Sequence, residues 1–166
     1  MSVVATAAEV LRSGRLPKTS AASGPQPVAF MREGDLGAVL FLLGTRAGEW
    51  MAIVALLRRA GDGWDEITLV HKPWWDPADP FDDDELMLTG GHSRFVTGPG
   101  PEVVLIAGQA AAGACISGVD GDVVVHPPAG HFIYVAAMAR HSQPVTLTAR
   151  RGGSEQTSVF EPPDIP

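Results

Sequence analysis

One cysteine and two histidines stand at spacings that would place them on neighbouring strands. Asp120-Gly121 has the form of a two-residue hairpin loop, and residues 127–130 have that of a four-residue loop. In this register Cys115 faces His126, and His126 faces His131. Because side chains alternate between the two faces of a strand, the three form one row. A thiol and two imidazoles in a row could bind zinc or copper, or form a Cys-His nucleophilic pair.

A structural interpretation of the same residues competes with this row. The row needs both turn assignments, since a slip of one residue moves a strand's side chains to the opposite face. The sequence also shows no acidic residue that would orient an imidazole for a catalytic triad. The alternative is a buried cysteine beside polar histidines at the rim. The face opposite the row carries Ile116, Val125, Phe132 and Tyr134, and we assign that face to the core. The sequence favours this second interpretation.

The stretch 71–85, HKPWWDPADPFDDDE, is the most acidic part of the chain. Its prolines remove backbone donors and its carboxylates repel one another, so we expect a long loop without regular structure. Six carboxylates could offer oxygen ligands to calcium: Asp76, Asp79, Asp82, Asp83, Asp84 and Glu85. Their spacing does not fit an EF-hand, which needs acids at alternate positions and a central glycine. A solvated acidic loop is the simpler expectation.

Three aromatic residues accompany these carboxylates, namely Trp74, Trp75 and Phe81. Exposed aromatics beside acids suit stacking on a sugar or holding a peptide. The alternative is a plug in which the tryptophans close the open end of a sandwich, and this alternative is favoured. If the loop does bind a partner, its carboxylates favour one of basic character.

Composition sets the limits for the whole chain. With 166 residues, 45% of them hydrophobic and 19% charged, the chain is long enough to bury a core. The net charge of −7 argues against nucleic acid or an anionic membrane as partner. The single cysteine allows no intrachain disulfide. The start shows neither a signal peptide nor a membrane span, so we expect a cytoplasmic protein.

The leading residues indicate a helix followed by a linker. Ser2 can cap a helix that runs to Leu11, and Gly14 is a plausible stop. An apolar stripe at helical spacing would dock it on the rest of the protein, although a partner's groove is the alternative. We assign residues 1–15 to this helical segment and 16–26, rich in Pro, Ser, Ala and Gly, to a flexible linker. Residues 161–166 form a tail.

From residue 27 the periodicity becomes that of strands. Expected strands span 28–32, 36–43, 49–59, 64–70, 86–89 and 155–160, with a meander over 103–150. The segment 36–43 is apolar on both faces, as a strand covered from both sides would be. Within 144–150, Val145, Leu147 and Ala149 point one way and their neighbours the other. Turns are expected at 61–63, Gly90-Gly91, 97–101 and 151–154.

About ten strands and one helix predict an all-β protein. We expect residues 27–160 to form one antiparallel two-layer β-sandwich, immunoglobulin-like in a general sense, or a partly open barrel. The Cys…Trp…Cys signature of immunoglobulin domains is absent, as are glycine-rich phosphate loops and common hydrolase motifs. The sequence therefore favours a non-enzymatic binding module that uses 71–85 to contact a protein or small ligand, without a cofactor. The alternative is a small metal-dependent or Cys-His hydrolase.

Overall fold

The computed structural model describes residues 2–18, 23–96, 102–138 and 143–162. Within these ranges the chain forms one helix and eleven strands, which lie in three antiparallel sheets. The prediction of an all-β fold with one short leading helix is confirmed. The turn expected at 97–101 lies outside the described residues, as do residues 19–22 of the expected linker and the end of the expected tail.

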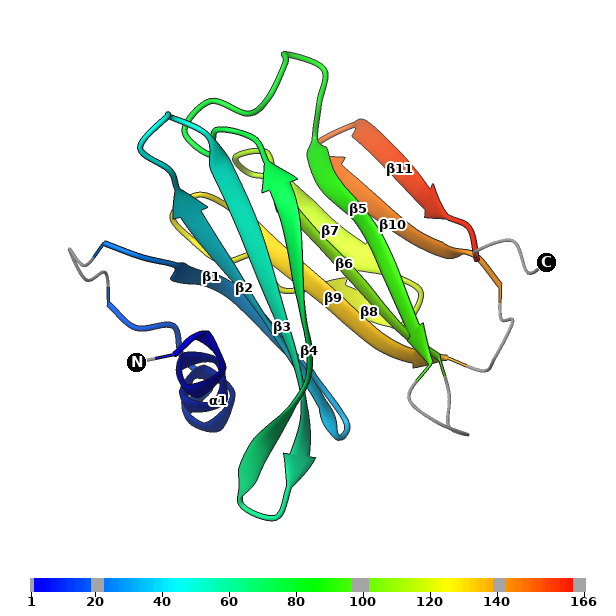
Figure 1. Ribbon diagram of the computed structural model, residues 1–166. Coiled ribbons are helices and arrows are strands. Elements are labelled where there is room, and N and C mark those ends of the chain that lie inside the picture. Colours follow the sequence, from blue (N-terminus) through cyan, green and yellow to red (C-terminus); the bar gives the residue numbers. More distant parts are fainter. Residues whose placement is uncertain (1, 19–22, 97–101, 139–142, 163–166) are drawn as a thin grey trace.

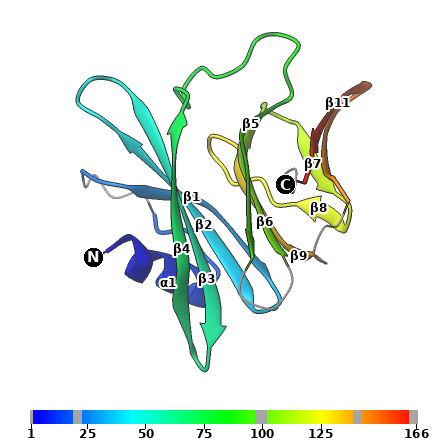
Figure 2. The ribbon, with the colours of Figure 1, turned by 45° about the vertical axis from the view of Figure 1, so that its right-hand side comes forward.

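The three sheets are stacked as layers, and the helix lies outside the first of them (Figure 2). The first sheet contains β1 (Gln26–Glu33), β2 (Leu36–Gly44), β3 (Trp50–Ala60) and β4 (Gly63–Trp74), in that order. The middle sheet has the order β5 (Met87–Val96), β6 (Glu102–Ala110) and β9 (His131–Met138). The third has the order β11 (Ser154–Phe160), β10 (Val145–Arg151), β7 (Cys115–Gly118) and β8 (Gly121–Val123).

The middle sheet is covered on both faces, which explains why three sheets replace the two expected layers. Every residue of β6 is buried. Val103 and Leu105 pack toward the first sheet, whereas Val104 and Ile106 pack toward the third. An uninterrupted apolar run is the pattern of a strand that meets no water on either side. Two cores therefore share one sheet.

The first sheet is also covered twice, because the helix α1 (Val3–Ser13) lies against its outer face (Figure 1). Val39 and Phe41 of β2 face α1, and Ala38 and Leu40 face the middle sheet. This confirms the expectation that the segment 36–43 is apolar on both sides because both sides are covered.

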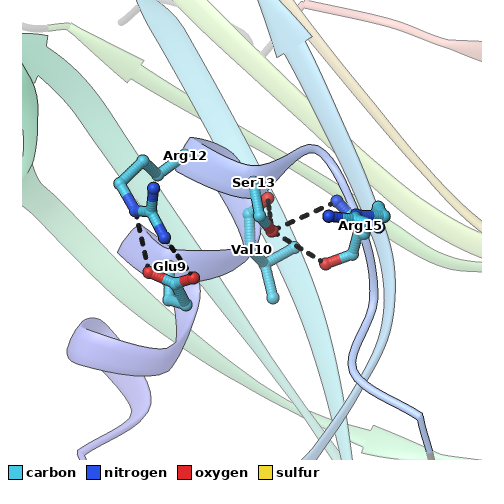
Figure 3. Close-up of polar contacts among 5 residues, drawn as sticks. All are labelled: Glu9, Val10, Arg12, Ser13 and Arg15. Atoms are coloured by element: carbon cyan, nitrogen blue, oxygen red, sulfur yellow. Dashed lines mark hydrogen bonds and ion pairs between the residues drawn. The ribbon is translucent and has the colours of Figure 1, made fainter.

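The predicted helix ends are confirmed. Ser2 is the N-cap, and its side chain accepts a hydrogen bond of 3.1 Å from Ala5 N. Gly14 is the C-cap in the left-handed region, at φ 67°. On the exposed side Arg12 pairs with Glu9 at 2.6 Å, and the Ser13 hydroxyl lies near two backbone carbonyls (Figure 3).

Close packing at Gly37 brings α1 onto the sheet. A Cβ atom at this position would lie 2.6 Å from Leu11 Cδ1 and 3.0 Å from the ring of Trp64. Arg32 Nη1 donates a hydrogen bond of 3.2 Å to Leu11 O at the end of the helix. Glycine is therefore needed at residue 37 for steric reasons, and the helix is attached by both apolar and polar contacts.

Two expected interruptions turn out to be parts of strands. The first four residues of the stretch 71–85 belong to β4, where Pro73 is tolerated because β4 is the edge of its sheet. Gly90-Gly91 is not a turn: it lies inside β5, where the pairing with β6 shifts between Thr89 and His92. This irregularity is a bulge, and Gly91 adopts φ 86° there.

The hairpin between β7 and β8 has a different register from the expected one. Ser117 pairs with Asp122 and Gly118 with Gly121, so the loop is Val119-Asp120 instead of Asp120-Gly121. Gly121 pairs in the ladder, which moves the turn one residue towards the N-terminus. The expected pairing of His126 with His131 is confirmed as an isolated bridge.

Side chains join β5 of the middle sheet to β11 of the third. Gln156 Oε1 accepts hydrogen bonds from Leu86 N (2.8 Å) and Met87 N (3.1 Å), while its Nε2 donates to Met87 O (2.8 Å). Further along β5, Arg94 pairs with Glu102 at 3.2 Å in a buried ion pair and donates to Phe160 O at 2.9 Å.

Candidate functional site

The segment 75–86 crosses one end of the sheets, and the β3–β4 turn lies at the opposite end (Figure 1). Trp74, the last residue of β4, is 8% exposed and packs over Gly90, where a Cβ would lie 2.7 Å from its ring. Its indole stacks on that of Trp75 at 4.0 Å between centroids. Trp74 is thus not an exposed anchor, and Trp75 is only partly covered.

A buried glutamine holds this segment in place. Gln109, 2% exposed, lies on β6. Its Oε1 accepts from Trp75 Nε1 at 2.7 Å, and its Nε2 donates to Pro77 O at 3.1 Å and Ala129 O at 2.8 Å. One side chain therefore connects the acidic segment to the loop 127–130.

The two histidines lie at the ends of that loop, and both are buried. His126 N donates to His131 O at 2.8 Å, and Gly130 N donates to His126 O at 2.9 Å. The expectation of polar histidines at a rim is wrong, because β9 is buried on both faces and its His131 is 3% exposed. His126 is 9% exposed, with its ring 5.0 Å from that of Phe30.

Burial keeps both imidazoles neutral at pH 7. It lowers the pKa of His131 to about 4, with the nearby His126 as the second cause. Burial also lowers the pKa of His126, against which a hydrogen bond to the Phe30 backbone acts in the opposite direction. His131 Nε2 and Trp74 Nε1 are both buried, and neither has a hydrogen-bond partner among the residues that the structure describes. Their rings are neighbours, with centroids 6.4 Å apart.

Cys115 does not join the histidines. It is exposed, whereas the expectation was a buried thiol, and it pairs with Arg150 of β10 on the third sheet. The shorter hairpin explains the difference, since β8 ends at Val123 and never extends to His126. In the described part of the chain no three side chains of His, Cys, Asp or Glu are placed to hold a metal ion.

A cavity of about 390 Å³ lies under the acidic segment, and we call it the loop cavity. Its walls come from residues 77–78, 80–81, 109–114, 125 and 127–130. The lining is proline, alanine and glycine, together with Phe81, Val125 and Gln109. None of the described residues that line it carries a charged side chain, so the cavity suits an uncharged apolar group.

The six carboxylates of this segment divide into two groups. Asp76 and Glu85 accept hydrogen bonds from Ala78 N (2.9 Å) and Asp82 N (3.2 Å), which shape the loop. The other four are exposed: Asp79 lies between the lining residues Ala78 and Pro80, and Asp82, Asp83 and Asp84 directly follow the lining residue Phe81. A negative rim therefore borders an uncharged cavity.

A second cavity of about 550 Å³ lies at the ends of β3 and β4. Trp50, Met51, His71, Lys72 and Asp76 are among its lining residues. Burial lowers the pKa of Lys72. Charges of both signs line this cavity, so it does not favour a ligand of one charge. The exposed residues beside the loop cavity, in contrast, are carboxylates.

The sequence pattern identified the acidic segment but not the residues that hold it in place. Gln109 and the turn 111–114 were not singled out, although Gln109 is the one strongly polar residue in the apolar run 103–111. A lone amide in a strand buried on both faces must find partners there. This requirement could have identified Gln109 as a residue that binds other segments.

Comparisons with known proteins add no family to this description. No protein-family model, no curated protein and no solved structure matches the chain. None of the described residues belongs to a helix long and apolar enough to cross a membrane. Function must therefore be inferred from the geometry of the chain itself.

Proposed function

We propose that this protein is a non-enzymatic binding module that takes a ligand with an apolar body and a cationic group. The apolar body would enter the loop cavity, and the carboxylates of Asp79 and residues 82–84 would hold the cation. The observation that carries the proposal is that one segment supplies both a wall of an uncharged cavity of about 390 Å³ and exposed carboxylates adjacent in sequence to that wall.

Physical chemistry supports this division of roles. Apolar pockets of a few hundred Å³ are the usual size for small ligands, and a few polar groups at the mouth fix the orientation. Exposed carboxylates raise the local concentration of cations and speed encounter, an effect that salt screens. Gln109 keeps two walls of the cavity at a fixed separation, which lowers the ordering cost of binding.

The hydrolase alternative has less support. It needs Cys115 beside an imidazole, but Cys115 is exposed on the third sheet, whereas both imidazoles are buried. A neutral buried His131 without a nucleophile beside it cannot act as the base of a Cys-His pair. The cytoplasmic location remains a prediction of the sequence.

Three probes with the same apolar body test the proposal: 4-phenylbutylamine, 4-phenylbutanol and 4-phenylbutanoate. We expect the amine to bind most tightly and the acid least, with the amine's advantage shrinking as salt is raised. Amide and indole chemical shifts report the location, with Ala112, Gly130 and the Trp75 indole as the residues expected to respond.

Matched variants distinguish the effect of the carboxylates at the rim from the effect of the protein's overall negative charge. Changing Asp82, Asp83 and Asp84 together to Asn should remove the preference for the amine. The control changes Asp62 and Asp65 to Asn and Glu66 to Gln, exposed acids near the β3–β4 turn at the opposite end, and should leave the preference intact (Figure 1). Equal binding of all three probes, or shifts that avoid the loop cavity, would contradict the proposal.

A further inference from the structure

The loop 127–130, which forms one wall of the loop cavity, is flanked at each end by a buried histidine. His126 precedes the loop and His131 follows it, and their backbones are paired. Inside the loop, Gly130 O accepts from Ala110 N at 2.9 Å and Ala129 O accepts from Gln109 at 2.8 Å. The wall is therefore held by backbone bonds between the two histidines and by two bonds from β6.

Each imidazole also contacts a different neighbouring strand. His126 Nε2 lies 3.1 Å from Phe30 O and 3.4 Å from Phe30 N, so it bonds to the backbone of β1 in either tautomer. The His131 ring lies beside Trp74 of β4. Both contacts are made by residues that directly flank the loop, so an opening that displaces His126 and His131 together with the loop would break them and expose both imidazoles to water.

We propose that His126 and His131 form an acid-sensitive latch that keeps this wall of the loop cavity closed while both imidazoles are neutral.

The surroundings of the pair favour the neutral forms. The neighbours from β1, β4 and β6 are uncharged, namely Phe30, Trp74 and Gln109. The nearest charge along β4 is Lys72, itself a cation, and among the described residues no carboxylate has a resolved effect on either imidazole. A proton on His131 would charge a buried ring whose Nε2 already lacks a partner.

Proton uptake is therefore coupled to opening. An imidazole that reaches water recovers an ordinary pKa of about 6.5, whereas closure lowers that of His131 to about 4. Between these values one extra proton binds to the open form, so the open population rises about tenfold for each pH unit of acidification. His126 acts in the same direction.

Hydrogen exchange measures the latch without any ligand. The amides of Gly130 and Ala110 report the loop, and that of Ile106 reports the centre of β6. After correction for the chemical exchange rate, the two loop amides should lose protection by about two orders of magnitude between pH 6.5 and pH 4. Ile106 should stay protected.

Single variants test whether His131 causes the pH dependence of exchange. His131→Phe removes one of the two proton-binding groups and should reduce the pH dependence of the loop amides to the part that His126 contributes, whereas replacing exposed His71 of β4 by Asn should leave it unchanged. If His131→Phe fails to fold, the ring resonances of His131 in the native protein must instead titrate far below pH 6.5. Protection that does not change with pH, or loss that spreads equally to Ile106, would overturn the latch.

Opening of this wall in acid would release a ligand from the loop cavity; this consequence rests on the proposed function, but the exchange experiment does not. If the loop opens in acid and 4-phenylbutylamine never binds, the proposed function fails and the latch stands. If the amine binds at the loop cavity and the exchange rate of the Gly130 amide, corrected for chemical exchange, does not depend on pH, the latch is refuted and the proposed function stands.

Discussion

Gln109 shows how much a single amide can organise at a site that water does not enter. Its three hydrogen bonds use the acceptor once and the donor group twice, so no part of the amide is left unsatisfied. A residue that could only accept or only donate would leave at least one buried partner unpaired.

This gives the first prediction. Gln109→Glu retains the shape but replaces two donated hydrogen bonds with a carboxylate facing two carbonyl oxygens. Each orphaned buried group costs about 1–3 kcal/mol, so we expect a loss of roughly 3 kcal/mol or more in the free energy of unfolding. Urea denaturation measures it, with exposed Gln143→Glu as the neutral control.

Phe132 tests which side chains form the core between the middle and third sheets. It is fully buried, and a Cβ on Gly108 would lie 2.5 Å from its ring. We expect Phe132→Ala to lower the free energy of unfolding by about 3–5 kcal/mol. Val124→Ala, at a side chain 66% exposed, should change it by less than about 0.5 kcal/mol. Similar effects at both positions would show that this core is assigned to the wrong residues.

At the scale of elements, the seating of α1 depends on the space left at Gly37. Gly37→Ala would place a methyl group within 2.6 Å of Leu11, so the helix must move away from the sheet. Hydrogen exchange should show faster exchange at the α1 amides, while β6 amides stay unchanged. Gly153→Ala, where no atom lies within 4 Å of the added Cβ, is the matched control. Unchanged protection of α1 would mean that the contact is easily relaxed.

The local sequence pattern predicts most helices and strands well, but it predicts poorly where the strands end and with which strands they pair. The alternation of Val145, Leu147 and Ala149, all buried, was readable because one face of β10 meets water. The continuation of β4 to Trp74 was missed because acidic and proline-rich sequence masked it. Pairing with β3 stabilises those residues, and such pairing is a tertiary effect that local propensity does not contain.

The candidate site was predicted only in pieces. The facing pair His126 and His131 followed from a four-residue loop, which is local. The exclusion of Cys115 depended on where the β7–β8 hairpin turns, and an Asp-Gly pair misplaced that turn by one residue. The loop cavity could not be inferred at all, because three segments far apart in the sequence build it.

For the molecule as a whole, acid should be destabilising well before the carboxylates titrate. His131 binds a proton more weakly when folded, so the unfolded chain carries more protons between pH 6.5 and about 4. Its contribution to stability is complete above pH 6.5 and declines as the pH falls through that window, by about 3 kcal/mol in all. Below pH 4 the decline from this group stops.

Urea denaturation at several pH values checks this, using the difference between native protein and His131→Phe. The slope of unfolding free energy against pH should be smaller in the variant between pH 6.5 and pH 4, by up to about 1.4 kcal/mol per unit. Identical slopes would show that His131 is not desolvated in the folded state.

The side-chain amide of Gln156 affects the tendency of this protein to self-associate. A strand at the edge of a sheet offers unpaired backbone groups to any other chain, and β5 is such an edge. Gln156 of β11 takes the place of a peptide group there, because its amide accepts from two backbone N–H groups of the segment 86–87 and donates to one carbonyl. The backbone groups at the start of this edge are thus already paired within the chain. Loss of this one amide would therefore appear first as concentration-dependent aggregation of a still-folded chain.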